Sequence, residues 1–253
     1  MSYTLITGAS AGIGSVFAKQ LAEQGQNLIL SARRKEKLDE LANKLSSQYK
    51  INVETLSADL AKPEGSQELA DAITAKGWQV NGLINNAGFG DRGLFSDLAL
   101  DRQIQMIQLN VTSLIDLTHR LLPNIRQQKN AFIINVASTA AFQAGPNMAI
   151  YYATKAFVLS FSEALHEELK KDNIAVSTLC PGATESEFAQ EANMTNTKLF
   201  KAGAMTAEQV VKKSLKKRHK AIVITGSKNI FGVWSGKVSP RSVTRKLAGW
   251  LQA

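Results

Sequence analysis

A strand-like run followed by closely spaced glycines starts almost at the N-terminus and limits what this chain can fold into. Residues 3–7 are mainly apolar, glycines follow at Gly8, Gly12 and Gly14, and apolar residues then recur at helical spacing. A strand, a glycine turn and a helix in this order let the backbone approach a pyrophosphate, which the N–H groups at the helix start can bind. The spacing G-x-x-x-G-x-G differs from the common dinucleotide fingerprint, and an ordinary strand-to-helix turn would also explain the glycines.

The tip of the second predicted strand bears on which dinucleotide would bind. Residues 26–32 form a buried-type run, and Arg33 and Arg34 follow it. In NAD-binding sheets an acidic residue stands roughly 20 residues after the glycines and binds the ribose 2′-hydroxyl. Here that place is held by Ala32, and a neighbouring guanidinium would bind a 2′-phosphate that a carboxylate would repel. The sequence therefore favours NADP(H) over NAD(H), although either arginine could simply begin a solvated helix.

Predicted strands alternate with predicted helices along the chain. The strands are expected at residues 3–7, 26–32, 52–58, 80–85, 130–137, 174–179 and 221–225. This alternation predicts right-handed βαβ crossovers and an α/β fold, a Rossmann-type doubly wound sheet of seven parallel strands with helices on both faces. No internal repeat or low-complexity linker interrupts it, so residues 1–253 are expected to form a single domain.

Polar side chains follow several of these strands, at the edge where an open parallel sheet meets its ligand. Asp59 could accept a hydrogen bond from an adenine amino group, or it could cap the next helix. Asn85 and Asn86 end the fourth strand, and Ser138 stands at the end of the fifth. We therefore expect polar groups from separate strands to meet at one edge of the sheet.

Three residues could perform acid–base chemistry at that edge. Tyr151 and Lys155 are four residues apart at a predicted helix start, so both project from one face. The ordinary phenol pKa of about 10 would be lowered by a nearby ammonium together with the positive ring of an oxidised nicotinamide. Tyr151 could then exchange a proton with a substrate oxygen that Ser138 holds by a hydrogen bond.

Each of these residues also has an ordinary explanation. A Tyr-x-x-x-Lys pair by itself is common on protein surfaces, Ser138 could merely end a strand, and Asn110 could be a solvated residue in mid-helix. Tyr152 could replace Tyr151 as the acid, but it lies three residues from Lys155 and breaks the four-residue spacing.

Six motifs nevertheless occur together in one order: Gly8-x-x-x-Gly12-x-Gly14, Asn85-Asn86-Ala87-Gly88, Asn110, Ser138, Tyr151-x-x-x-Lys155 and Pro181-Gly182. In this order and spacing, over residues 3–225, the chain resembles the short-chain dehydrogenase/reductase family. The resemblance implies an oxidoreductase that interconverts a carbonyl compound and its secondary alcohol by hydride transfer with NADP(H). It implies a catalytic tetrad of Asn110, Ser138, Tyr151 and Lys155, with Tyr151 as proton donor and acceptor. Asn110 would hold a water that links the lysine to solvent.

The resemblance also implies a cofactor-binding set, namely Gly8, Ser10, Gly12, Ile13, Gly14, Arg33, Asp59, Asn86, Tyr151, Lys155, Pro181, Thr184 and Ser186. Thr184 and Ser186 match positions that meet the nicotinamide carboxamide, and the run Ser31-Ala32-Arg33 resembles that of NADP-preferring members. Ala11 departs from some of those members, which have a basic residue there. Arg33 would then be the main residue that binds the 2′-phosphate, with Ser10 or Arg34 as further contacts.

The sequence says less about the substrate and the partners than about the cofactor. Residues 183–205 are polar and lack apolar periodicity, which is typical of a lid over a site. Phe89, Phe142, Met148, Phe188 and Met194 indicate a largely apolar pocket for a small-molecule carbonyl or alcohol. Arg92 could meet a substrate carboxylate or be solvated. The family resemblance implies a homodimer or homotetramer through the helices at 101–126 and 151–171.

Positive charge is concentrated towards the C-terminus. The net charge is +9, but residues 198–253 contain thirteen Lys or Arg and one acid, so they carry +12. Nucleic acid, anionic lipid and plain solvation could each account for this charge. No nucleic-acid partner is expected, because a basic patch without a recognised module is poor support for one.

The basic extension 226–253 also contains many apolar residues. Packing over the cleft or against another subunit is favoured over a membrane surface, because the residues lack one clean apolar stripe over a long helix. Peripheral membrane contact of this tail is left open.

Composition bears on location and on competing functions. Cys180 is the only cysteine, no apolar run approaches the roughly 18 residues of a membrane span, and Met1 leads straight into a strand. These features favour a cytoplasmic, or membrane-peripheral, protein. Three scattered histidines give no metal site. The competing hypotheses are a catalytically silent NADP-binding sensor or scaffold, and a basic-tail binder of nucleic acid or membrane.

Overall fold

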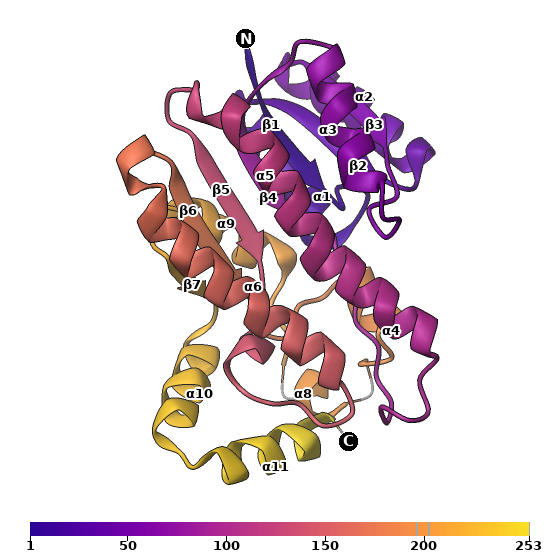
Figure 1. Ribbon diagram of the computed structural model, residues 1–253, viewed down its shortest axis with the longest axis vertical. Helices are drawn as coiled ribbons and strands as arrows, with labels where there is room; N and C mark the ends of the chain where they lie inside the picture. Colours follow the sequence, from indigo (N-terminus) through magenta and orange to yellow (C-terminus); the bar gives the residue numbers. More distant parts are fainter. Residues whose placement is uncertain (196, 202, 253) are drawn as a thin grey trace.

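The computed structural model describes residues 1–195, 197–201 and 203–252. Its centre is one parallel sheet with the strand order β3-β2-β1-β4-β5-β6-β7 (Figure 1). The strands are β1 (Ser2–Thr7), β2 (Asn27–Ala32), β3 (Val53–Ser57), β4 (Gln79–Asn85), β5 (Phe132–Val136), β6 (Ala175–Cys180) and β7 (Ile222–Ile224). The predicted sheet of seven parallel strands is confirmed. Residues 196, 202 and 253, which the predicted lid and tail include, lie outside the described residues.

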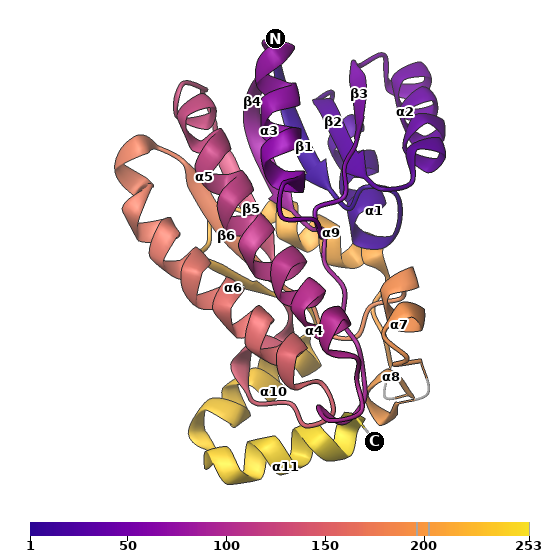
Figure 2. The same cartoon turned by 45° about the vertical axis from the view of Figure 1, so that its right-hand side comes forward.

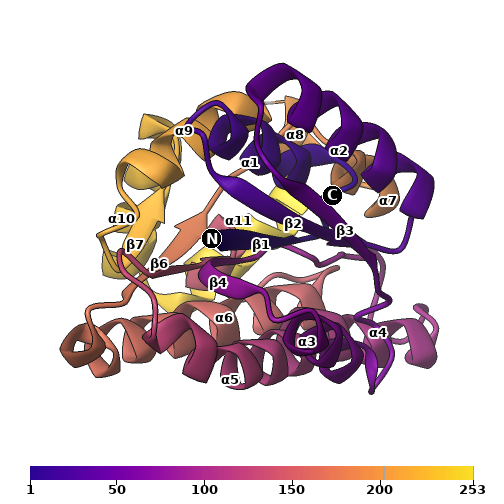
Figure 3. The same cartoon turned by 90° about the horizontal axis from the view of Figure 1, so that it is seen from above.

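Helices cover both faces of the sheet (Figure 3). They are α1 (Gly12–Ala22), α2 (Lys35–Tyr49), α3 (Gly65–Ala75), α4 (Leu100–Ile107), α5 (Ser113–Arg126), α6 (Ala149–Glu168), α7 (Glu187–Glu191), α8 (Lys198–Lys201), α9 (Ala207–Lys216), α10 (Ser227–Val238) and α11 (Arg241–Gln252). Shorter turns are the π-helix η1 (Gln108–Thr112) and the 3-10 helices η2 (Thr139–Phe142) and η3 (Lys170–Asp172). In the described residues, none of the helices has both the length and the apolar character that crossing a membrane requires.

The strands read as nearly continuous apolar runs because both of their faces are buried. Successive residues of a strand point to opposite faces, so Ile6 packs with α1, α2 and α9, while Leu5 packs with α3 and α5. The same alternation places Ile134 and Ile133 of β5 in the two opposite cores. The sheet is therefore the shared wall of two hydrophobic layers, and its carboxyl edge is left to carry polar groups.

The predicted helix at 101–126 is interrupted at its centre. It consists of α4, the wide π turn η1 and α5, and Asn110 lies in the π turn with its side chain buried. A π turn inserts an extra residue and redirects the side chains within it, and such turns are frequent at functional sites. The sequence pattern predicted the helix but gave no sign of this turn.

Elements beyond the carboxyl ends of the strands close one end of the molecule. The predicted loop 183–205 contains α7 and α8, and the tail after β7 forms α10 and α11, which are separated at Pro240. These helices gather at the end of the molecule opposite the N-terminus (Figures 1 and 2). α11 contacts α8, so the tail and the predicted lid pack together.

A buried amide network joins β4 and β5 to the helices on one face. Asn85 donates from Nδ2 to Thr118 Oγ1 and Asn135 Oδ1, both at 2.9 Å, and Asn135 donates to Ser162 Oγ at 2.8 Å. The expectation that both strand-end amides face a ligand is wrong for Asn85, because its side-chain amide is hydrogen-bonded within this network. Asn86, one residue on, turns to the opposite side.

We expect Asn135→Ala to lower the free energy of unfolding by about 1–3 kcal/mol, because it leaves buried polar partners unsatisfied. Urea denaturation measures this effect. Gln127→Ala, at an exposed position just after α5, should change the free energy by less than about 0.5 kcal/mol. Equal stabilities of wild type and Asn135→Ala would show that the network contributes nothing.

Candidate active site

The turn between β1 and α1 requires glycine at three positions. Gly8 and Gly12 have φ values of +64° and +54°, in the left-handed region. Gly14 has no room for a side chain, because a Cβ there would overlap the Gly8 carbonyl oxygen. Asn86 holds the turn by donating from Nδ2 to the carbonyl oxygens of Thr7 and Gly8, at 2.9 and 3.2 Å. Ala11 precedes α1 and offers no side-chain oxygen, so the first N–H groups of the helix are available to an anion.

One cavity, of about 250 Å³, connects this turn to the other candidate residues. The glycine turn and Asn86 form one wall, and Ser138, Tyr151 and Lys155 form another. Pro181, Thr184 and Ser186 line it from the segment after β6, and residues of α7, α8 and α11 line its outer part. A second lobe, lined by Arg33, Asp59 and Leu60, shares Gly8, Ser10 and Arg34 with the first.

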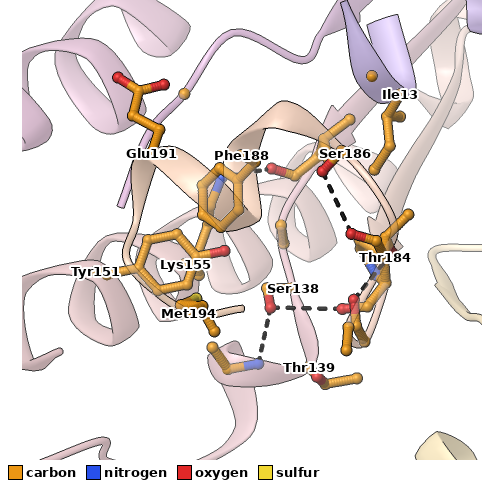
Figure 4. Close-up of a pocket in the computed structure, with 18 of the residues that line it drawn as sticks. Ile13, Ser138, Thr139, Tyr151, Lys155, Thr184, Ser186, Phe188, Glu191 and Met194 are labelled. Atoms are coloured by element: carbon orange, nitrogen blue, oxygen red, sulfur yellow. Dashed lines mark hydrogen bonds between the residues drawn. The ribbon is translucent and has the colours of Figure 1, made fainter. Parts of the chain in front are cut away.

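Ser138 and Tyr151 face each other across the cavity. Ser138 has extended backbone after β5 and begins the turn η2, where its Oγ accepts from the Ala140 N–H at 3.1 Å. Its hydroxyl also lies 3.4 Å from the Pro181 carbonyl oxygen. Figure 4 shows the phenol oxygen of Tyr151 pointing towards the Ser138 hydroxyl, on the side of the cavity that holds Thr184 and Ser186. Both oxygens can therefore reach one substrate oxygen.

Lys155 carries an ammonium group into a buried position. It follows Tyr151 by one helical turn on α6, and its Nζ donates to the Val136 carbonyl oxygen at 2.9 Å. The same Nζ lies 5.7 Å from the centre of the Tyr151 ring. Burial lowers the pKa of this ammonium to about 8, an effect that the Cys180 side chain opposes. Lys155 therefore stays mainly protonated at neutral pH, and its ammonium lies close to the phenol ring.

In the chain without a cofactor, the pKa of the Tyr151 phenol is raised and not lowered. Burial raises the Tyr151 pKa above its ordinary value, and the opposing hydrogen bond from Ser138 does not cancel this rise. In the chain alone, desolvation is the larger effect. The predicted lowering, which also needs the positive ring of an oxidised nicotinamide, stays a prediction.

The Asn110 side chain is hydrogen-bonded to the loop that follows β4. Its Oδ1 accepts from the Phe89 N–H at 3.1 Å, and its Nδ2 donates to the Phe89 carbonyl oxygen at 2.9 Å and to Thr154 Oγ1 at 3.2 Å. Gly88 lies between Asn110 and Lys155, because a Cβ there would come within 2.8 Å of Asn110 Oδ1 and 3.5 Å of Lys155 Nζ. The amide therefore fixes the strand-end loop against α6, and its part in a proton relay stays a prediction.

The two arginines after β2 have different surroundings. Arg34 donates from Nη2 to Ser10 Oγ at 3.0 Å and lines both lobes, whereas Arg33 lines only the second lobe. Asp59 also lines the second lobe, and its Oδ1 accepts from the Ala61 N–H at 3.1 Å. Its alternative role as the cap of the next helix is wrong, because α3 begins later, at Gly65.

Contacts from the lid and the tail were missed in the sequence. Glu187 of α7 pairs with Arg34 at 2.8 Å and with Lys37 at 3.2 Å. Gln252 of α11 donates to the Tyr152 phenol oxygen at 2.9 Å. Arg92 is partly exposed and donates to the Gln252 and Asn193 carbonyl oxygens, at 2.8 and 3.0 Å, and it is not among the described residues that line the cavity. Such long-range partners leave no local signal in a sequence.

The predicted apolar pocket is partly correct in its membership. Phe188 and Met194 line the cavity, and the Phe188 ring centre lies 5.5 Å from that of Tyr151. Phe142 and Met148 are not among its described lining residues, and Phe89 lines the second lobe. Leu199, Phe200, Ala248 and Leu251 contribute apolar surface instead.

Comparison with known proteins identifies the family. The short chain dehydrogenase family model matches residues 2–197. This chain belongs to the short-chain dehydrogenase family. It is 34% identical over 186 residues to a very-long-chain 3-oxoacyl-CoA reductase of Anas platyrhynchos, covering 71% of this chain and 59% of the relative. It is 32% identical to the uncharacterized oxidoreductase YvaG of Bacillus subtilis, covering 87% of this chain and 81% of the relative.

A solved short-chain dehydrogenase from Sphingobium yanoikuyae, in complex with NADPH, matches this fold with a TM-score of 0.83. The two are 32% identical, and the match covers 94% of this chain and 93% of the other. Membership of this family and the NADPH-bound structural neighbour support a nicotinamide cofactor as the ligand of the cavity. The chain spans about 59% of the duck relative, so the substrate of that relative is not transferred with the fold.

The low pKa of Lys155 gives a pH-dependent stability. The unfolded chain holds this proton up to about pH 10.4, whereas the folded protein releases it near pH 8. The unfolded state therefore binds more protons between these values, and the Lys155 contribution to the free energy of unfolding rises with pH there. Below pH 8 the full cost of the buried ammonium remains.

We expect the free energy of unfolding of wild type, relative to Lys155→Met, to rise by about 2 kcal/mol from pH 8 to pH 10. Urea denaturation of both proteins at each pH measures the difference, and other titrating groups cancel in it. Parallel pH dependences of the two proteins would contradict a buried, depressed ammonium.

Proposed function

We propose that this short-chain dehydrogenase interconverts a carbonyl compound and its secondary alcohol with NADP(H), using Tyr151 as proton donor and acceptor. The observation that carries the proposal is the shared cavity. Ser138, Tyr151 and Lys155 line the same space as the glycine turn and the start of α1. A catalytic trio and a phosphate-binding turn on opposite walls suit a reaction between a substrate oxygen and a bound dinucleotide.

The residues present fit a nicotinamide dinucleotide. The glycine turn allows close backbone approach, the N–H groups of α1 face the cavity, and Asn86 holds both from β4. Thr184 and Ser186 line the opposite side, where their backbone and hydroxyl groups would meet a carboxamide. When bound, the cofactor supplies hydride transfer. The protein supplies orientation and the proton.

The proton chemistry belongs to the chain. The Ser138 hydroxyl would hold the substrate oxygen, and the Tyr151 phenol would give that oxygen a proton during reduction or take one during oxidation. Burial keeps the phenol protonated, which suits a proton donor in the reductive direction. Lys155, next to the ring and held by the Val136 carbonyl, would stabilise the phenolate that remains.

Arg33 and Arg34 support NADP(H) as the preferred cofactor. Both guanidinium groups line the second lobe, and no carboxylate follows β2 at the position that binds a ribose hydroxyl in NAD-dependent sheets. Arg34 is already held by Ser10, which orients its remaining N–H groups. We assign the 2′-phosphate to these three residues.

The lining of the outer cavity supports an apolar substrate. Phe188, Met194 and Leu199 come from the lid segment, and Leu251 comes from the tail. The name of the duck relative, a reductase of very-long-chain 3-oxoacyl-CoA, agrees with a carbonyl attached to apolar carbon. A homodimer or homotetramer remains our proposal for the assembly, supported by exposed Leu100 and Ile104 on α4 and Phe157 on α6.

We expect Tyr151→Phe to reduce kcat by about 10²- to 10⁴-fold, the range that a general acid contributes, without loss of cofactor binding. Steady-state NADPH oxidation with a panel of ketones measures the first effect, and quenching of protein fluorescence by NADPH measures the second. Tyr152→Phe is the matched control and should stay within a few-fold of wild type. A Tyr151→Phe enzyme that keeps most of its kcat would remove the proposed proton donor.

We expect Arg33→Met and Arg34→Met each to raise the KM for NADPH by about 10- to 100-fold, since a charge-assisted hydrogen bond contributes about 1.5–3 kcal/mol. The KM for NADH should change little, because NADH lacks the 2′-phosphate. Arg126→Met, whose guanidinium pairs with Asp172 on the surface, is the control. Equal changes for both cofactors would refute the assignment of the 2′-phosphate to these arginines.

A further inference from the structure

The two tail helices expose more large apolar side chains than their packing requires. We call the exposed residues of α10 and α11 the tail face. Its large apolar members, with the exposed percentage of each, are Phe231 75%, Trp234 63%, Val238 84%, Val243 54%, Leu247 54% and Trp250 56%. They recur at i, i+3, i+7 on α10 and at i, i+4, i+7 on α11, so each helix carries one continuous outward stripe.

The packing of the tail against its own chain uses other residues. On α11, Ala248, Leu251 and Gln252 line the cavity, and Val233 of α10 is buried. A surface helix of a globular protein needs one apolar stripe for its core contact. α11 has an inner stripe that meets the cavity and a separate outer stripe formed by Val243, Leu247 and Trp250. The tail has no single apolar stripe over one long helix, as expected, because it forms two helices that are separated at Pro240.

The charge of the tail has a single sign. Residues 226–253 contain five Lys or Arg and no Asp or Glu. Lys237 places its ammonium 5.3 Å from the Trp234 ring centre, and Lys198 of α8 places its own 4.4 Å from the Trp250 ring centre. Exposed indoles beside lysines suit the interface of a bilayer, where the ring lies at the level of the headgroups and the amine meets anionic lipid.

A second copy of this chain is a poorer occupant of the tail face. Homodimers are most often isologous, so the same patch meets itself across a twofold axis. Two copies of the tail face would bring Lys237, Arg245 and Lys246 against the same cations without any acid in the segment to offset them. Juxtaposed like charges disfavour such a contact, whereas an anionic surface complements it.

We propose that the tail face binds an anionic lipid surface, with α10 and α11 lying in the plane of the headgroups. Each helix has twelve residues and is too short to span a bilayer, so the attachment is peripheral. The inner side of α11 lines the cavity, so the attachment places the cavity next to the bilayer. The proposal rests on exposed residues and charge, and it is independent of the assigned substrate and cofactor.

Flotation of the full-length protein with vesicles tests this. We expect binding to phosphatidylcholine vesicles that contain about one third phosphatidylglycerol, and little binding to pure phosphatidylcholine. About 0.5 M sodium chloride should release most of the bound protein, because it screens exposed charges. A blue shift of tryptophan emission on binding would report entry of Trp234 or Trp250 into the interface.

Two sets of variants separate the apolar and electrostatic parts. Phe231→Ser with Trp234→Ser, and Lys237→Glu with Lys246→Glu, should each weaken vesicle binding at least about tenfold. The matched controls, Leu94→Ser with Phe95→Ser and Lys44→Glu with Lys62→Glu, change exposed residues elsewhere and should bind as wild type. Thermal midpoints and activity on a water-soluble ketone should stay unchanged in all four proteins, which shows that folding and the catalytic site are intact.

Three results would overturn the proposal. The first is no flotation with anionic vesicles at low salt. The second is binding that the control variants reduce as much as the tail variants do. The third is a tail-dependent dimer in sedimentation velocity, or tail-dependent retention of duplex DNA, in a protein that ignores vesicles; either would assign the tail face to a second copy or to nucleic acid.

Discussion

The buried ammonium of Lys155 is the interaction on which the arrangement of the site depends. A charged amine removed from water is costly unless it is neutralised or given acceptors, and the structure provides a backbone carbonyl, that of Val136. Among the described residues, no carboxylate pairs with it in a salt bridge. Its pKa falls to about 8 as a result. The same constraint positions α6 on β5, and therefore sets where Tyr151 stands relative to Ser138.

The parallel sheet explains why residues so far apart in sequence meet. All of its strands end at one edge, so the segments after β1, β4, β5 and β6 bring the glycine turn, Asn86, Ser138 and Pro181 to one cavity. The residues that we propose to act on the substrate stand at strand ends or near helix starts, where backbone groups lack helix or sheet partners. The two apolar layers below only hold that edge in place, which is why the strands themselves can be almost uniformly apolar.

The elements that cover the cavity are held by contacts other than those of the sheet. The lid and α11 pack on the site through a separate apolar cluster that includes Ala192, Met194 and Ala248. Charged or polar contacts at its margin include Glu187 with Arg34 and Arg92 with the Gln252 carbonyl. Glu187 is about half exposed in this pair, so water screens it and its contribution to stability is small. The apolar cluster therefore contributes more to holding the cover than these exposed charged contacts do.

Strand positions, the glycine turn and the pair Tyr151 and Lys155 could be predicted because each follows from local chemistry. Burial on both faces makes a strand apolar, positive φ demands glycine, and one helical turn sets the spacing of two side chains. The same reasoning did not foresee the partners of Asn85 and Arg92. These partners are Thr118 and Asn135 for the first and the tail for the second, and none of them is encoded near the residue.

The amino-acid sequence by itself determined the fold class, the glycine turn and the residue types available for proton transfer, because these depend on spacing and periodicity within short segments. Only the tertiary structure decided that Arg34 rather than Arg33 contacts Ser10, that Asn110 lies in a π turn and holds Phe89, and that α11 has one side in the cavity and the other exposed. These contacts depend on which distant segments come together when the chain folds. Periodicity can show that a helix has an apolar side, but not what that side will touch.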